Sequence, residues 1–143
     1  MATKDRERQM RVVAEILRVH LPEWLEKDPE LARDLVSVAG TALETIHQDA
    51  EKSAKAWDKR AYHVRADRFR REWAWVPGAA NYAIGLALRD QPITAAALEK
   101  LAQLIRPDLE KPYRRQISDP TRFRGATKAV RAQQASRKTP IRW

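Results

Sequence analysis

The stretch from Thr41 to Val76 contains no proline or glycine, and this feature constrains the fold more than any other. Proline removes a backbone donor, and glycine raises the entropic cost of ordering a helix, so the absence of both permits an uninterrupted helix. Thr41 and Glu44 match a capping box, in which two side chains satisfy free amides of the first helical turn. The sequence therefore predicts one helix of about 35 residues, roughly 50 Å long at 1.5 Å per residue.

The apolar pattern within this helix changes face partway along. At 100° per residue, the first stripe consists of Leu43, Ile46, Ala50, Ala54, Trp57, Ala61 and Val64. The second stripe lies about 100° further round and consists of Tyr62, Ala66, Phe69, Trp73 and Val76. A regular heptad drift of about 20° is too small to explain that step. We expect either a kink near residues 62–66 or two halves that pack against different neighbours.

Helical signals also dominate the residues on either side. Asp28-Pro29 predicts an N-cap followed by proline at the first helical position, and this helix is expected to end at Gly40. Pro77 breaks the long helix, and the apolar residues 79–88 after it predict a buried helix. Thr94 begins a last body helix that ends before Pro107. Because period-two alternation is missing, we predict an all-α fold, a small helical bundle around the long helix.

Composition changes sharply near residue 106. Leu, Ile, Val and Phe account for 24 of residues 1–105 but for only five of residues 106–143. The second share is below the ~20% typical of chains that pack a core. The sequence thus predicts a helical body over residues 1–106 and a basic tail over residues 107–143. This tail is expected to be extended or partially disordered, and residues 127–138 could form a weak helix on contact with a partner.

The charge is distributed as unevenly as the apolar residues. The chain has a net charge of +9, yet residues 1–51 carry −4 and residues 106–143 carry +8. Such asymmetry favours an anionic partner for the basic part, and the acidic first third could dock a protein neighbour. The general alternative is that the charge only maintains solubility.

Two basic regions supply the candidate nucleic-acid contacts. Arginine forks bind phosphate oxygens bidentately, and aromatic rings beside them can stack on bases. A basic edge from Lys52 to Arg70 would span ~27 Å and follow on the order of eight phosphates. The predicted phosphate contacts are Lys52, Lys55, Lys59, Arg60, Arg70, Arg71, Arg114, Arg115, Arg122 and Arg124. The predicted stacking residues are Trp75, Tyr113 and Phe123, whereas Phe69 and Trp73 are expected to belong to the core.

Signals for catalysis are weak throughout the sequence. Cysteine is absent, and His20, His47 and His63 are too far apart to form a helical ligand pair. Neither a nucleophile elbow nor a phosphate-cradling glycine loop is present. We therefore expect no enzyme, no metal and no cofactor. The longest uncharged run, residues 73–88, is shorter than the ~18–20 residues of a membrane span, and the first twenty residues contain no apolar signal region. These features predict a soluble, cytoplasmic protein.

The leading functional hypothesis is a non-catalytic accessory protein that binds nucleic acid, with RNA or single strands preferred, within a ribonucleoprotein or larger complex. In size, helicity and charge the chain is similar to small basic all-α subunits of ribonucleoprotein assemblies, such as the small helical subunits of CRISPR effector complexes. Two alternatives remain open: an adaptor or assembly factor whose tail binds an acidic protein, and peripheral association with a membrane surface.

Overall fold

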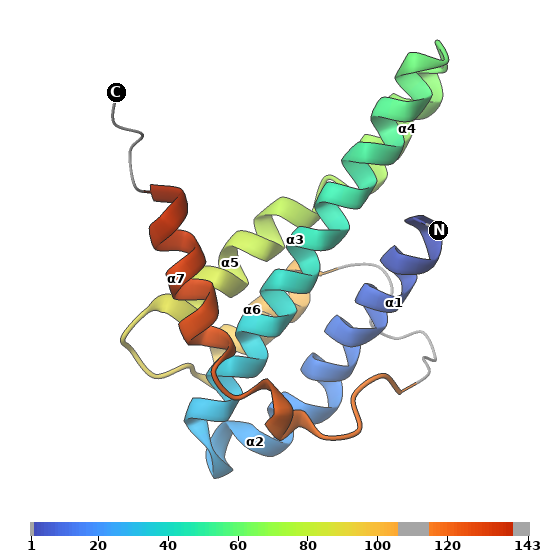
Figure 1. Cartoon of the computed structure of the whole chain (residues 1–143). Helices are drawn as coiled ribbons and strands as arrows, with labels where there is room; N and C mark the ends of the chain where they lie inside the picture. Colours follow the sequence, from blue (N-terminus) through green and yellow to red (C-terminus); the bar gives the residue numbers. More distant parts are fainter. Residues whose placement is uncertain (1, 106–114, 139–143) are drawn as a thin grey trace.

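The computed structural model of the chain describes residues 2–105 and 115–138 (Figure 1). Every regular element in these two ranges is a helix, which confirms the predicted all-α fold. The α-helices are α1 (Ala2–Glu15), α2 (Leu21–Lys27), α3 (Pro29–Lys59), α4 (His63–Glu72), α5 (Val76–Leu88), α6 (Ala95–Leu104) and α7 (Ala126–Lys138). A π-helical turn, η1 (Ile16–His20), joins α1 to α2, and a 3-10 helix, η2 (Pro120–Phe123), precedes α7.

The long central helix, α3, begins earlier than predicted. Its N-cap is Asp28, whose side chain accepts a hydrogen bond of 3.1 Å from the backbone N–H of Leu31, as the sequence indicated. The helix then continues through Gly40 and Thr41, so the predicted end and capping box there are wrong. Gly40 instead permits close packing of α5, because a Cβ at this position would lie 2.6 Å from Cδ1 of Ile84.

The chain reverses direction immediately after α3. Ala61 adopts the left-handed conformation, with φ of 64°. The backbone N–H of Ala61 bonds to the carbonyl of Asp58, and that of Tyr62 bonds to the carbonyl of Trp57, both at 2.9 Å. This pair of bonds forms a Schellman motif, which ends α3 and turns the chain. The predicted single helix from residue 41 to residue 76 is therefore wrong, and the alternative of a break near residues 62–66 is close to the observed arrangement.

Helix α4 packs back along the second half of α3 to form a helical hairpin (residues 47–72). The rings of Trp57 and Phe69 meet edge to face with centroids 4.9 Å apart. A small cluster of buried residues fills the space between the two helices: Ala50, Ala54, Ala66 and Phe69. Ala61 and Val64, predicted on the inner stripe of a continuous helix, are instead exposed at the tip, with 75% of Val64 accessible.

The main core lies at the other end of α3. Helices α1, α2 and α5 contribute buried side chains around the first half of α3, and Leu101 of α6 completes the layer. The alanine-rich α5 is buried as predicted, with Ala79, Ala83 and Ala87 fully inaccessible. Small side chains on α5 allow its backbone to approach α3 closely, as the contact at Gly40 also shows.

The described part of the tail is docked on the body rather than extended away from it. Ile117 and Val130 are buried, and α7 contacts α3. The carboxylate of Asp34 on α3 accepts hydrogen bonds from the backbone N–H groups of Gly125 and Thr127, at 3.0 and 2.9 Å. These bonds satisfy free amides at the start of α7, a role that usually belongs to a local N-cap residue.

A buried carboxylate provides the second attachment of the tail. Glu15 is fully buried, and its two oxygens accept the backbone N–H groups of Gln116 and Ile117 at 2.6–3.2 Å. Nε2 of the buried His20 lies 2.7 Å from the same carboxylate, and Nε of Arg115 lies 3.8 Å from it. We call these residues the Glu15 cluster. Polar contacts thus hold the tail on the body, although its low apolar content had predicted that it would not pack.

Candidate nucleic-acid interface

The hairpin extends beyond the remaining helices, with its tip at the turn between α3 and α4 (Figure 1). Arg6 of α1 fixes its base. Nη1 of Arg6 lies 2.7 Å from a carboxylate oxygen of Asp49, and its guanidinium lies 4.9 and 5.7 Å from the ring centroids of Phe69 and Trp73. Because Arg6 is itself buried, these contacts hold the hairpin firmly on the body.

Two of the predicted phosphate contacts are matched by carboxylates of the hairpin itself. Arg70 lies between Glu51 and Asp58, at 3.2 and 2.8 Å. Hydrogen bonds from His63 and Arg70 lower the pKa of Asp58 below its usual value. Arg71 pairs with Asp67 one turn earlier on α4. The expectation that Arg70 and Arg71 are free is corrected, because the chain reversal brings Arg70 beside Glu51 instead of ~27 Å beyond Lys52.

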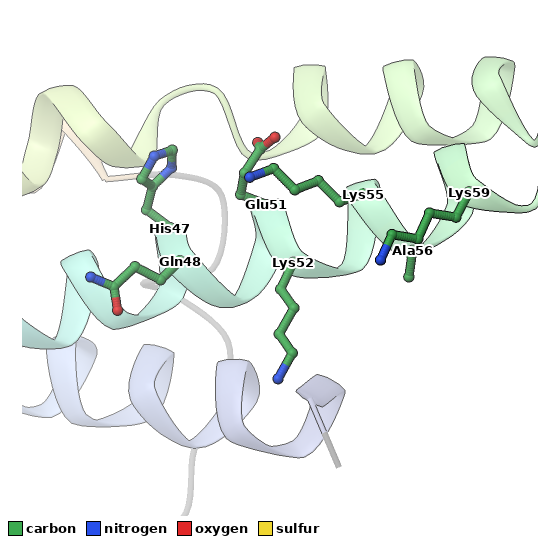
Figure 2. A pocket seen from close by; sticks show the side chains of 7 residues that line it. All are labelled: His47, Gln48, Glu51, Lys52, Lys55, Ala56 and Lys59. Carbon is green, nitrogen blue, oxygen red and sulfur yellow. The ribbon is translucent and has the colours of Figure 1, made fainter.

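Lys52, Lys55 and Lys59 form a row on the exposed side of α3. Figure 2 shows them along a shallow hollow of about 570 Å³, which His47, Gln48, Glu51 and Ala56 also line. No carboxylate of the described residues lies within 4 Å of any of the three ammonium groups. Lys59 follows Lys52 by seven positions, about 10 Å along the helix, which corresponds to roughly three phosphates of one strand rather than eight.

The hairpin tip adds further cations to this row. Arg60, predicted as a contact, is exposed at the end of α3. Arg65 and Arg68 are exposed on α4 and line a second hollow, of about 750 Å³, together with Ala61, Tyr62, His63 and Val64. Arg65 also lies over the ring of Trp57, at 5.7 Å. Among the described carboxylates, none pairs with Arg60, Arg65 or Arg68.

Sequence reasoning missed Tyr62, Arg65 and Arg68 because it placed them along one continuous helix. No glycine, asparagine or proline marks the turn, since Ala61 occupies the left-handed position that glycine usually takes. The step in the apolar stripe near residue 62 was the one available signal.

The tail arginines predicted as phosphate contacts are only partly available to a partner. Arg124 pairs with Asp28 at 2.6 Å, and this hydrogen bond, together with one from the backbone of Leu31, lowers the pKa of Asp28. The expectation that Arg124 is free is therefore corrected. Arg122 is exposed, with its guanidinium 4.9 Å from the ring centroid of Phe123. Arg115 is two-thirds exposed but belongs to the Glu15 cluster. Tyr113 and Arg114 lie outside the described residues.

The two remaining predicted stacking residues are half-buried rather than free. Trp75 packs against the main core, with its ring centroid 6.2 Å from that of Trp73. Phe123 also packs against this core. Phe69 is buried and Trp73 is half-buried, as expected of core residues. By contrast, Tyr62 at the hairpin tip is 54% exposed.

Several carboxylates of the acidic first third are used inside the protein. Glu15 and Asp34 hold the tail, Asp28 caps α3 and pairs with Arg124, and Asp49 pairs with Arg6. The surface left for docking a basic partner is correspondingly smaller than the sequence indicated.

Within residues 2–105 and 115–138, no three His, Asp or Glu side chains come together in a way that could hold a metal ion. In the same ranges, no helix combines the length and apolarity that crossing a membrane requires. Compared with known proteins, the chain matches no protein-family model, no curated protein and no solved structure.

Proposed function

We propose that this chain is a non-catalytic accessory protein that binds nucleic acid through the basic surface of its helical hairpin. One observation supports the proposal above all: among the described residues, Arg6, Arg70 and Arg71 pair with carboxylates, whereas a second group of cations along the exposed side and tip of the hairpin has no carboxylate partner. We call the second group the hairpin cations. They are Lys52, Lys55, Lys59, Arg60, Arg65 and Arg68.

Unpaired cations on a projecting element are typical of binding sites for a polyanion. A phosphate backbone gains affinity when Lys and Arg neutralise its charges and release condensed counterions. The nearby carboxylates Glu51 and Asp58 pair with Arg70 instead, so within the described residues these six groups keep their charge available to a partner. Arg122 and Arg115 of the docked tail would extend the contact only if the strand reached the far end of α3.

The proposal is tested by fluorescence anisotropy with labelled single-stranded RNA and DNA of about 12 nucleotides, within the length that small single-strand binding folds cover. If all six hairpin cations neutralise phosphates, the slope of log K against log salt is about −4, at −0.7 per phosphate. Replacing Lys52, Lys55 and Lys59 with glutamine should make that slope less steep, at about −2.

A matched control removes the same number of charges elsewhere. Arg8, Arg89 and Lys128 are exposed on α1, after α5 and on α7, and their replacement with glutamine should leave the slope near its wild-type value. Equal effects of the two triple variants would show that only net charge matters, and would contradict the proposed surface. Unmeasurable RNA and DNA binding, together with binding to polyglutamate that depends on exposed cations of the tail such as Arg122, would favour the adaptor alternative.

A further inference from the structure

We infer that Tyr62 at the hairpin tip is a base-stacking residue, so that the hairpin recognises unpaired nucleotides rather than duplex. This inference rests on the proposed function and specifies its ligand as a single strand. Nothing in the sequence pattern assigned Tyr62 this role, because the apolar stripe placed it on the buried face of a continuous helix.

The exposure of Tyr62 is the first observation behind the inference. Among the described residues, the large apolar side chains with high exposure are Tyr62, Val64 and Leu104, and two of these three lie at the hairpin tip. Tyr62 is 54% accessible, whereas Trp57, Phe69 and Trp73 are half-buried or buried. An aromatic ring gains free energy from burial, so one left in solvent at a projecting tip is available to a partner.

The backbone at the tip is the second observation. Ala61 holds a left-handed conformation that a residue with a Cβ adopts only at a cost. The Schellman bonds of Ala61 and Tyr62 fix this turn, so the backbone that carries the ring is ordered before any partner binds. Such preorganisation lowers the entropic cost of binding.

The positive charge around Tyr62 is the third observation, and it favours a partner that carries phosphates. Tyr62 shares its hollow with Arg65 and Arg68, and Lys59 and Arg60 immediately precede the turn. A flexible strand can place a base on the ring and its flanking phosphates on these cations at the same time. In a duplex the bases are already stacked on one another, so only the two terminal base pairs offer the ring a free face.

A membrane surface is the competing class of partner, because exposed apolar residues flanked by cations also occur on lipid-binding elements. The tip offers only Tyr62 and Val64 as large exposed apolar groups, which is little area for insertion. Six unpaired cations with one exposed ring fit a nucleic-acid strand better than a bilayer.

The test compares Tyr62→Ala, Tyr62→Phe and Val64→Ala in the full chain. Each is titrated against a labelled single-stranded RNA of about 12 nucleotides and a duplex of the same length. Loss of the ring should weaken single-strand binding at least about fivefold, the lower limit for one base–aromatic stack. Tyr62→Phe and Val64→Ala should remain within about twofold of wild type, and duplex affinity should not change in any variant. Circular dichroism checks that all three variants retain wild-type helicity.

Three results would overturn the inference, each in a distinguishable way. Salt-dependent RNA binding that falls in the lysine triple variant but not in Tyr62→Ala would leave the proposed function intact and exclude stacking. Equal losses for Tyr62→Ala and Val64→Ala would indicate a general apolar contact. A third result would reject both proposals in favour of a membrane surface. In it, wild type binds vesicles of phosphatidylcholine and phosphatidylserine but no RNA, and Tyr62→Ala and Val64→Ala both lose the vesicle binding.

Discussion

Replacing Glu15 with alanine should destabilise the protein more than any other single loss of a carboxylate. The side chain is fully inaccessible and is the acceptor for two backbone N–H groups and for His20. Removing one partner of a buried charged network typically costs about 3–5 kcal/mol, and each buried N–H left without an acceptor costs about 1–3 kcal/mol. These two estimates describe the same lost contacts, so they are not added.

Release of the tail sets an upper limit on this loss. If residues 115–117 leave the body, their amides reach water, but Ile117 is exposed at a cost of about 1.5–3 kcal/mol. Because the variant adopts the less costly of these two states, we expect Glu15→Ala to lower the free energy of unfolding by about 1.5–3 kcal/mol, out of the roughly 5–15 kcal/mol usual for a domain. The stability of Glu15→Gln should lie between those of wild type and Glu15→Ala. The glutamine amide keeps one acceptor oxygen but turns an NH₂ group toward the donors.

Urea denaturation followed by circular dichroism measures the stability, and hydrogen exchange locates the change. Exchange at the amides of Gln116 and Ile117 should accelerate in Glu15→Ala before exchange in α3 does. Glu26→Ala, which removes an exposed carboxylate from α2, should lie within about 0.5 kcal/mol of wild type. A loss below about 1 kcal/mol in Glu15→Ala, with unchanged exchange at both amides, would refute the assigned role of the Glu15 cluster.

Three further predictions concern the helical packing and the turn. Gly40→Ala should leave the free energy of unfolding about 1–3 kcal/mol below that of Gly85→Ala in urea denaturation, because both variants gain helix propensity but only the methyl group at residue 40 overlaps the Ile84 side chain. Gly85→Ala, which has open space, should raise the free energy of unfolding by about 0.5–1 kcal/mol, and equal gains for both variants would contradict the close approach. Ala61→Gly should raise the melting temperature, since glycine takes φ of 64° without the steric cost of about 1 kcal/mol; a lower melting temperature would count against strain at the turn. The folded pKa of Asp58 lies below its unfolded value of 3.8, so its pairing stabilises the hairpin above pH 3.8 and is lost as the pH falls through the folded pKa. Acid titration of Asp58→Asn should therefore show a shallower loss of helicity between about pH 5 and pH 2 than wild type, and identical curves would exclude this contribution.

Local signals predicted much of the fold correctly. Asp28 caps α3, and Thr94 caps α6 by accepting the backbone N–H of Ala97 at 3.1 Å. Both caps depend on residues within three positions of each other, so the sequence alone contains the necessary information. The burial of α5 was predictable for a similar reason, because residues 79–88 are rich in small and aliphatic residues on every side.

The hairpin was not predictable from residue types. Its turn rests on Ala61, a good helix former that carries no sequence signal for a left-handed conformation. Packing between Trp57 and Phe69 compensates for the cost of that conformation, and this contact joins residues that a continuous helix would hold far apart. Missing this turn also affected the predicted phosphate contacts, because Arg70 was expected to be a free cation on a continuous helix.

Docking of the tail was missed for a different physical reason. The low apolar content of the tail did not reveal its packing, because polar side chains of the body bind it in addition to the buried Ile117 and Val130. Glu15 and Asp34 bond to backbone groups more than 90 positions away in the sequence, and such pairings leave no local pattern.

The cap that Asp34 provides has a consequence for the order in which the molecule assembles. An isolated segment of 13 residues is about the shortest that forms a measurable helix in water, and α7 has that length without a carboxylate of its own in its first turn. The contact that caps the start of α7 comes from Asp34 on α3, a helix that is synthesised long before α7. We therefore expect residues 126–138 to be largely unstructured as a free peptide, and to acquire helicity late, using the surface of α3 as a template.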